Sequence, residues 1–128
     1  MSREPAPLPL RARRGALAER IAASHVADLG MTVLERNLRV GHLEIDILAQ
    51  EGRSIVVVEV RCRGGGSWLR ALDTVDWVKR RRLRRAAAIL WARRWRKLSG
   101  IERVRFDVAA VELDGLDAPS VEYVRAAF

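Results

Sequence analysis

The chain has 128 residues, with 24 Lys and Arg against 16 Asp and Glu and a net charge of +8. This length predicts one domain that is large enough to build a hydrophobic core. The single cysteine excludes a disulfide framework. No apolar run is long enough for a membrane span or a signal peptide. We therefore expect a cytoplasmic protein, whose charge fits a polyanionic partner such as DNA and fits a merely arginine-rich, solvated surface equally well.

The amino-terminal segment is predicted to be a flexible basic arm over residues 1–14, ahead of a folded domain over residues 15–128. The arm contains three of the four prolines and shows no apolar period. Its arginines either contact a phosphate backbone or remain solvated; they are Arg11, Arg13 and Arg14. A helix is expected over residues 16–29, stopped by Gly30. Its apolar stripe is formed by Leu17, Ile21, Ser24, Val26 and Leu29.

Three strands are predicted next, over residues 31–40, 43–49 and 54–63, and the short turns between them make an antiparallel meander. In the second strand, one face is expected to carry Leu43, Ile45 and Ile47, and the other Glu44, Asp46 and Leu48. The third strand, SIVVVEVRCR, is apolar on both faces, which is typical of a central strand covered on both sides. Its two faces are Ile55 and Val57, and Val56, Val58, Val60 and Cys62.

Two charged residues interrupt this central strand near its end. Glu59 and Arg61 are two residues apart and therefore share a face. Because burying a bare charge costs several kcal/mol or more, the two residues either form a structural ion pair or belong to an active site.

The remaining elements complete a single α/β domain. A glycine-rich loop over residues 64–67 is predicted to act as a flap or hinge. A long helix follows over residues 75–97, with Asp73 or Thr74 as its N-cap. A strand over residues 103–113, reached by a helical crossover, should run parallel to the central strand, and residues 120–124 can add an edge strand. The predicted sheet is mixed, in the order α-β-β-β-α-β(-β), with helices packed on it.

The long helix carries an unusual residue on each face. Lys79 lies in the middle of the apolar stripe that should face the sheet, so either its stem snorkels outward or its ammonium reaches the carboxylates of the central strand. The opposite face combines aromatic and basic residues, which suits stacking on unpaired bases and contact with phosphates. For the tryptophans we favour packing or a homodimer interface, and for the arginines phosphate contact. These residues are Trp77, Trp91 and Trp95, and Arg80, Arg81, Arg84 and Arg85.

Acidic residues recur on neighbouring strands in apolar surroundings. Asp46 and Glu59 lie on adjacent antiparallel strands, so their carboxylates can converge on a hard cation such as Mg²⁺ or Mn²⁺. Such a metal activates water for phosphodiester hydrolysis, and a nearby ammonium stabilises the transition state. On the next strand, Arg105 and Asp107 are expected to pair with each other. The histidines and the cysteine are too few and too scattered for a zinc site.

The spaced set of motifs resembles the YraN-like family of small bacterial proteins. The motifs are Glu19-Arg20-x-Ala22, Glu35-Arg36-Asn37-Leu38-Arg39, Glu44-Ile45-Asp46, Val58-Glu59-Val60, Lys79-Arg80-Arg81-Arg82-Leu83, Arg105-Phe106-Asp107-Val108 and Ala127-Phe128. The resemblance covers nearly the whole chain from about Gly15, and it implies a restriction-endonuclease-like domain of the PD-(D/E)xK type, similar to archaeal Holliday-junction resolvases. By the same resemblance, Asp46 and Glu59 are metal ligands and Glu19 lies near the metal.

The sequence departs from that pattern at two positions. The motif lysine falls on Arg61, and an arginine stays protonated and cannot act as a base. The glycine usual before Glu-Ile-Asp is Leu43. Either Lys79 supplies the missing ammonium group from the long helix, or the nuclease activity is lost.

Three hypotheses follow. The first is a Mg²⁺- or Mn²⁺-dependent endonuclease acting on DNA, on branched or damaged structures, with Asp46 and Glu59 on the metal and Glu19 and Glu44 as outer-shell or second-metal candidates. The second is a catalytically inactive nucleic-acid-binding domain on the same fold. The third is a protein-interaction module that uses its tryptophans, with the positive charge incidental.

Overall fold

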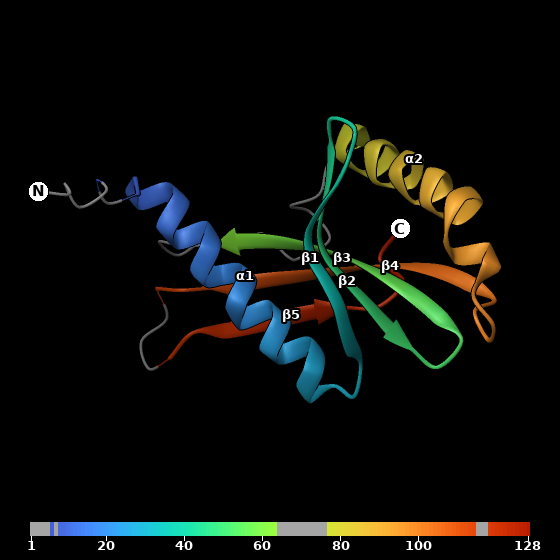
Figure 1. Cartoon of the computed structure of the whole chain (residues 1–128). Helices are drawn as coiled ribbons and strands as arrows, with labels where there is room; N and C mark the ends of the chain where they lie inside the picture. The colour runs from blue at the N-terminus through green and yellow to red at the C-terminus, as the bar shows by residue number, and fades with distance from the viewer. Residues whose placement is uncertain (1–5, 7, 64–76, 115–117) are drawn as a thin grey trace, which may run out of the picture.

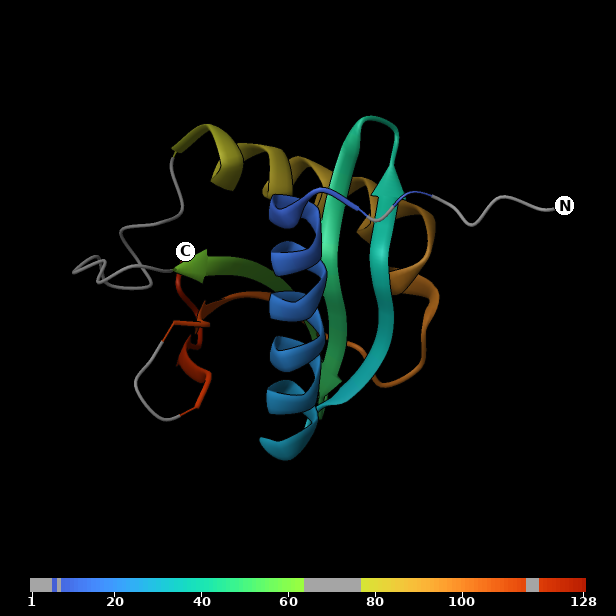
Figure 2. The same ribbon diagram turned by 90° about the vertical axis from the view of Figure 1, so that its left-hand side faces the viewer.

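The computed structural model describes residues 6, 8–63, 77–114 and 118–128 as a five-stranded mixed sheet with a helix on each face (Figures 1 and 2). The strands lie in their sequence order, and each neighbouring pair is antiparallel except β3 and β4, which are parallel. The fold class and the element order predicted from the sequence are confirmed. The elements are α1 (Leu10–Asp28), β1 (Thr32–Val40), β2 (Leu43–Glu51), β3 (Ser54–Arg63), α2 (Trp77–Arg93), the 3-10 turn η2 (Trp95–Lys97), β4 (Arg103–Glu112) and β5 (Ser120–Val124). No helix in this described part of the chain is long and apolar enough to cross a membrane.

Helix α1 begins earlier than the sequence analysis expected, inside the segment predicted to be a flexible arm. Pro9 occupies the N-cap position and the helix starts at Leu10. A proline is tolerated at a helix start, and the residues that follow it are mostly strong helix formers. Arg11, Arg13 and Arg14 are therefore helical residues, which corrects the prediction of a mobile arm at these positions.

The buried face of α1 also differs from the predicted stripe. Ala18, Ala22 and Val26 are the buried residues of α1, whereas Leu17 is 39% exposed. The small alanine side chains allow the helix backbone to approach the sheet closely. The predicted stripe is therefore wrong at Leu17 and at Ser24, which are both exposed, and right at Val26.

Strand β3 is the central strand, as predicted, and each of its faces packs on a different helix. Val56 and Val58 join the core under α1, and Ile55 and Val57 join the core under α2. All four are fully buried. Cys62, in contrast, is exposed, because the pairing of β2 with β3 ends at Val58 and leaves the end of β3 uncovered on that side.

The β1–β2 hairpin is kinked in the middle. Asn37 has a φ of +52°, a left-handed conformation that asparagine tolerates better than most residues. On either side of it the ladder pairs Arg36 with Ile47 and Leu38 with Ile45. Across the kink the alternation of faces breaks, so Ile47 packs in the α1 core and Ile45 in the α2 core. The prediction that Ile45 and Ile47 share a face is wrong for this reason.

Helix α2 ends at Arg93, before the predicted boundary. The backbone of Arg94 leaves the helical region at φ −129° and ψ −57°, and one 3-10 turn follows. Trp95 in that turn is buried at 2% exposure, Trp77 is 77% exposed and Trp91 is partly buried. The three tryptophans therefore do not form one exposed face. The predicted glycine loop, the N-cap candidates and Val75 lie outside the described residues.

Candidate metal centre and basic surface

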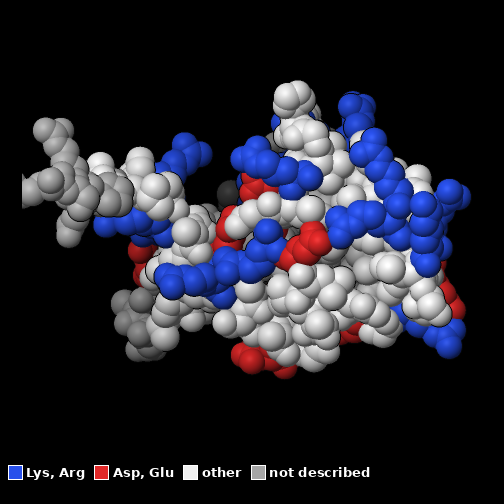
Figure 3. All heavy atoms as spheres, viewed as in Figure 1, with Lys and Arg blue, Asp and Glu red and all other residues white. Residues whose placement is uncertain are grey.

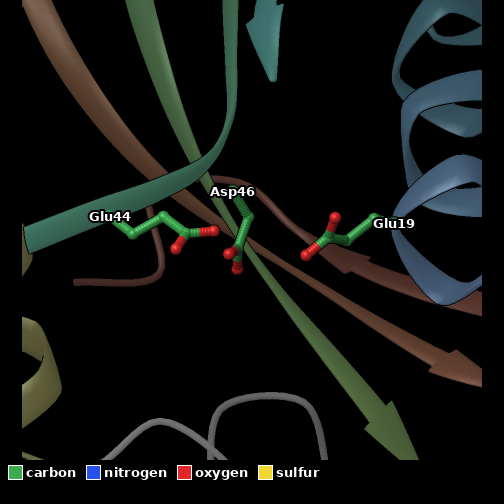
Figure 4. Close-up of side chains that lie close together, drawn as sticks. All are labelled: Glu19, Glu44 and Asp46. Carbon is green, nitrogen blue, oxygen red and sulfur yellow. The ribbon is translucent and has the colours of Figure 1, made fainter. Parts of the chain in front are cut away.

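Three carboxylates meet where the hairpin bends away from β3. Glu44 and Asp46 come from β2 and Glu19 from α1, and one oxygen of each lies within 4.8 Å of the others. Figure 4 shows Asp46 between the two glutamates, which approach it from opposite sides. The amide of Val60 on β3 donates a hydrogen bond of 2.9 Å to Asp46 Oδ2. Asp46 is thus held at the fork between β2 and β3.

Glu59 stands at the same fork and is almost fully buried, at 1% exposure. Its Oε1 lies 3.4 Å from Lys79 Nζ and 3.6 Å from Arg61 Nε. Its Oε2 is buried and has no hydrogen-bond partner among the described residues. Burial and the nearby Asp46 raise the pKa of Glu59 to about 8, although Lys79 and Arg61 act in the opposite direction. A buried, unsatisfied acceptor of this kind calls for a ligand or an unusual function.

The donor set fits a hard divalent cation. Burial and the charge of Asp46 also raise the pKa of Glu19. The ionised carboxylates of this cluster are therefore destabilised by burial and by repulsion from one another. Mg²⁺ and Mn²⁺ bind carboxylate oxygens, and Mg²⁺ retains water and substrate oxygens as its other ligands. The acids whose oxygens lie within 4.8 Å of one another, and which could hold such an ion together, are Glu19, Glu44 and Asp46. Glu59 is not part of that group, although it lies close enough to Asp46 for the two charges to interact, and it stays a candidate ligand from the sequence analysis. This assignment rests on the orphaned Glu59 oxygen and on the chemistry of the donors.

Asn37 is a residue of this site that the sequence analysis missed. With its amide nitrogen turned toward the acids, it donates to Glu19 Oε2 at 3.0 Å and to Glu44 Oε1 at 3.2 Å. Its left-handed backbone places it opposite Asp46 at the kink. An asparagine inside an otherwise regular strand pattern is unfavourable for a strand, and this was the available signal.

The residues proposed for catalysis are brought together from four elements. Asp46 and Glu59 share the fork with Glu19 from α1, and the inward orientation predicted for Lys79 on α2 is confirmed by its contact with Glu59. A small pocket of about 120 Å³ opens beside them, between the hairpin tip and α2. It is lined by His42, Leu43, Glu44, Lys79, Arg82 and Leu83.

The residues proposed for DNA contact are spread over two helices. On α2, Arg81, Arg84 and Arg85 are exposed, while Arg80 lies against aromatic rings. On α1, Arg11 and Arg13 are exposed. Arg14 is instead in an ion pair with Asp114, with 2.7 Å between Nη2 and Oδ2. Figure 3 shows the molecule from the same side as Figure 1. Acidic side chains lie near the middle of the visible surface, with Lys and Arg side chains on both sides of them.

Asp107 on β4 belongs to a separate, structural network. Arg105 donates to both its oxygens, at 2.9 and 3.0 Å. The Tyr123 hydroxyl and the Ala126 amide donate to it as well, at 2.6 and 2.9 Å. The predicted pairing of Arg105 with Asp107 is confirmed. Both carboxylate oxygens of Asp107 accept hydrogen bonds from other residues of the domain.

Comparison with known proteins places the chain in a group without an assigned activity. The model of the family described as "Uncharacterised protein family UPF0102" matches residues 18–111. A UPF0102 protein of Sorangium cellulosum is 46% identical over 89% of this chain and 79% of its own length. A UPF0102 protein of Moorella thermoacetica is 44% identical over 92% of this chain and 97% of its own length. The likeness to the YraN-like family seen in the sequence is thereby confirmed.

Proposed function

Because the chain belongs to the uncharacterised protein family UPF0102, whose name gives no activity, we propose from the site itself that the protein is a metal-dependent phosphodiesterase that cleaves DNA. The observation that carries the proposal is the buried Oε2 of Glu59, which lacks a partner among the described residues at a fork that also holds Asp46, Glu19 and Glu44. The proposed substrate class, branched or damaged DNA, comes from the family resemblance described in the sequence analysis.

Each residue at the fork has a role that its geometry supports. Asp46, oriented by the Val60 amide, and Glu59 present oxygens to a Mg²⁺ or Mn²⁺ ion. When bound, such an ion lowers the pKa of a coordinated water and neutralises charge on the phosphate. Lys79 reaches the same carboxylate from α2, where its ammonium can stabilise the negative charge that develops on the phosphate.

The contact of Arg61 with Glu59 favours a second candidate function. The two charges lie 3.6 Å apart, so Arg61 can replace a metal ion as the partner of Glu59. The protein would then be a nucleic-acid-binding module that has lost its chemistry. Arg61 and Lys79 both face Oε1 and leave Oε2 without a partner, and for this reason we place the metal-dependent activity first.

Calorimetric titration of Mn²⁺ into the protein tests the metal site directly. We expect saturable binding in the wild type that is lost in Asp46→Asn and Glu59→Gln. Asp28→Asn, which removes an acid at the far end of α1, is the matched control and should bind like the wild type.

A cleavage assay on labelled branched, single-stranded and duplex DNA then tests the reaction. The wild type should cleave with Mn²⁺ or Mg²⁺ and not with EDTA, while folded Glu59→Gln should bind DNA without cleaving it. Absence of metal binding in the wild type, with and without DNA, would leave the binding module as the function.

A further inference from the structure

A second concave surface lies on α2, apart from the acid cluster. It is a pocket of about 260 Å³ between the first turns of α2 and the last residue of the chain. Its lining consists of two aromatic rings and three guanidinium groups, from Trp77, Arg80, Arg81, Arg84 and Phe128. Because all the described lining residues are aromatic or basic, the pocket fits a ligand that is both flat and negatively charged.

The two aromatic rings of the pocket both lie close to the guanidinium of Arg80. The Phe128 ring stacks on Phe106, with 5.2 Å between the centroids, and the Ala127 amide donates to the Phe106 carbonyl at 2.7 Å. The Phe128 ring is therefore fixed to the sheet. The guanidinium of Arg80 lies 5.4 Å from the Phe128 ring and 5.8 Å from the Trp77 ring.

We propose that this pocket binds an unpaired base of a DNA strand, with the base stacked on Trp77 and on the Arg80 guanidinium and with the neighbouring phosphates on Arg81 and Arg84. Trp77 is 77% exposed, which leaves an indole face for a base. Aromatic rings and arginine planes are the surfaces on which proteins stack unpaired bases, and nearby arginines bind the backbone.

The position of the pocket connects it to the proposed cleavage site. Lys79, which contacts Glu59, and Arg80, which lines the pocket, are consecutive residues and point about 100° apart on the first turns of the helix. The pocket therefore lies within reach of a strand held at the acid cluster. The identity of the ligand rests on the proposed function, but its binding requires neither metal nor cleavage.

The test is fluorescence anisotropy with a labelled single-stranded oligonucleotide and its duplex, both in EDTA. Trp77→Ala should weaken single-strand binding about tenfold, which is the range for loss of one stacked base. Duplex binding should change much less, since paired bases are not available to stack. Trp77→Phe keeps a ring and should retain most of the affinity. Because Trp77 is exposed, both variants should melt like the wild type.

A second variant separates stacking from charge. Arg84→Ala should weaken single-strand and duplex binding alike and make the dependence on salt less steep. Equal losses on both DNAs with Trp77→Ala, or no loss, would overturn the proposal. So would competition by poly-glutamate as strong as that by the oligonucleotide, because an acidic peptide would then fill the pocket.

The two proposals fail in different ways. If the wild type shows no metal-dependent cleavage but Trp77→Ala still loses single-strand binding, the proposed function falls and the base pocket stands.

Discussion

Two buried carboxylates on neighbouring central strands have opposite surroundings. Asp107 on β4 is fully buried and receives hydrogen bonds from Arg105, Tyr123 and the Ala126 amide. Burial and the bond to Asp107 raise the pKa of Tyr123, so that its hydroxyl remains a donor. Glu59 on β3 is as deeply buried, but its cationic neighbours stand at 3.4 and 3.6 Å and its second oxygen has no partner in the described structure.

The difference separates an acid whose charge the fold satisfies from an acid whose charge the fold leaves largely unsatisfied. The donors around Asp107 tie the end of the chain to β4 and satisfy the charge completely. The surroundings of Glu59 leave its charge costly in the free protein, a common property of catalytic and metal-binding groups. Substitutions at the two positions should therefore affect stability in opposite directions.

The largest effect is expected from Asp107→Ala. Removing this carboxylate leaves Arg105, Tyr123 and the Ala126 amide without their shared acceptor, and the free energy of unfolding should fall by about 3 kcal/mol. Urea denaturation followed by circular dichroism measures the loss. Glu51→Ala removes a partly exposed partner of the same Arg105, which keeps its bonds to Asp107, and should cost about 1 kcal/mol. Similar losses in the two variants would contradict the comparison.

The next effect separates the two cations beside Glu59. If Lys79 stabilises the transition state, Lys79→Met should lower the DNA cleavage rate about a hundredfold, the low end for loss of one such group. Arg61→Lys keeps a positive charge and should change the rate only a few-fold. Initial rates at saturating Mn²⁺ provide the measurement. A large gain with Arg61→Lys would instead show that the arginine holds the site in an inactive state.

A smaller effect is expected from Asn37→Gly. Glycine adopts the left-handed backbone at this position but removes the amide that bridges Glu19 and Glu44. Mn²⁺ affinity should fall about tenfold, as is usual when a hydrogen-bond partner of a ligating group is lost. Calorimetry measures the affinity, and a melting curve checks that the fold remains. Unchanged affinity would assign Asn37 a role in the kink alone.

The last effect has the opposite sign, and concerns Glu59→Gln in the metal-free protein. The pKa of Glu59 rises from 4.5 to about 8 on folding, because burial and Asp46 outweigh Lys79 and Arg61. The stability gained by the protonated form is present below about pH 4.5 and is lost as the pH rises through about 8. Glu59→Gln should differ little from the wild type at about pH 5 and should be more stable than it at about pH 8.5, by a margin that grows as the pH rises between these values.

Thermal melts in EDTA across this pH range test that expectation. Equal pH dependence in the two proteins would mean that Lys79 and Arg61 neutralise Glu59 fully. The electrostatic contrast with Asp107 would then disappear.

The sheet was largely predictable from the sequence, because its signals are local. Period-two patterns and turn residues gave the strands, and the length of the crossover gave the parallel pairing of β3 with β4. The acids Asp46 and Glu59 and the inward Lys79 were also predictable, since each charge interrupts an apolar face. What these residues do in the cell is a separate question that the proposed experiments address.

The remaining features depend on backbone choices that a sequence pattern does not specify. One left-handed residue, Asn37, reverses the faces of the hairpin, so strict alternation misplaced Ile45. The helix break at Arg94 similarly removed Trp95 from the helix face that it was predicted to share with Trp77 and Trp91, and placed it in the core. The start of α1 at Leu10 was missed because the prolines and the absence of an apolar period in this segment favour a flexible arm, although Pro9 only precedes the helix.

The parallel pairing of β3 and β4 also affects how the protein is made. Paired residues in this ladder are about fifty positions apart in sequence, so during translation β3 emerges well before β4 can join it. In that interval the aliphatic run of β3 has an open edge, of the kind that aggregates or recruits chaperones. The strand that presents Glu59 is thus the one most dependent on completed synthesis, and a nascent chain released before β4 should be insoluble.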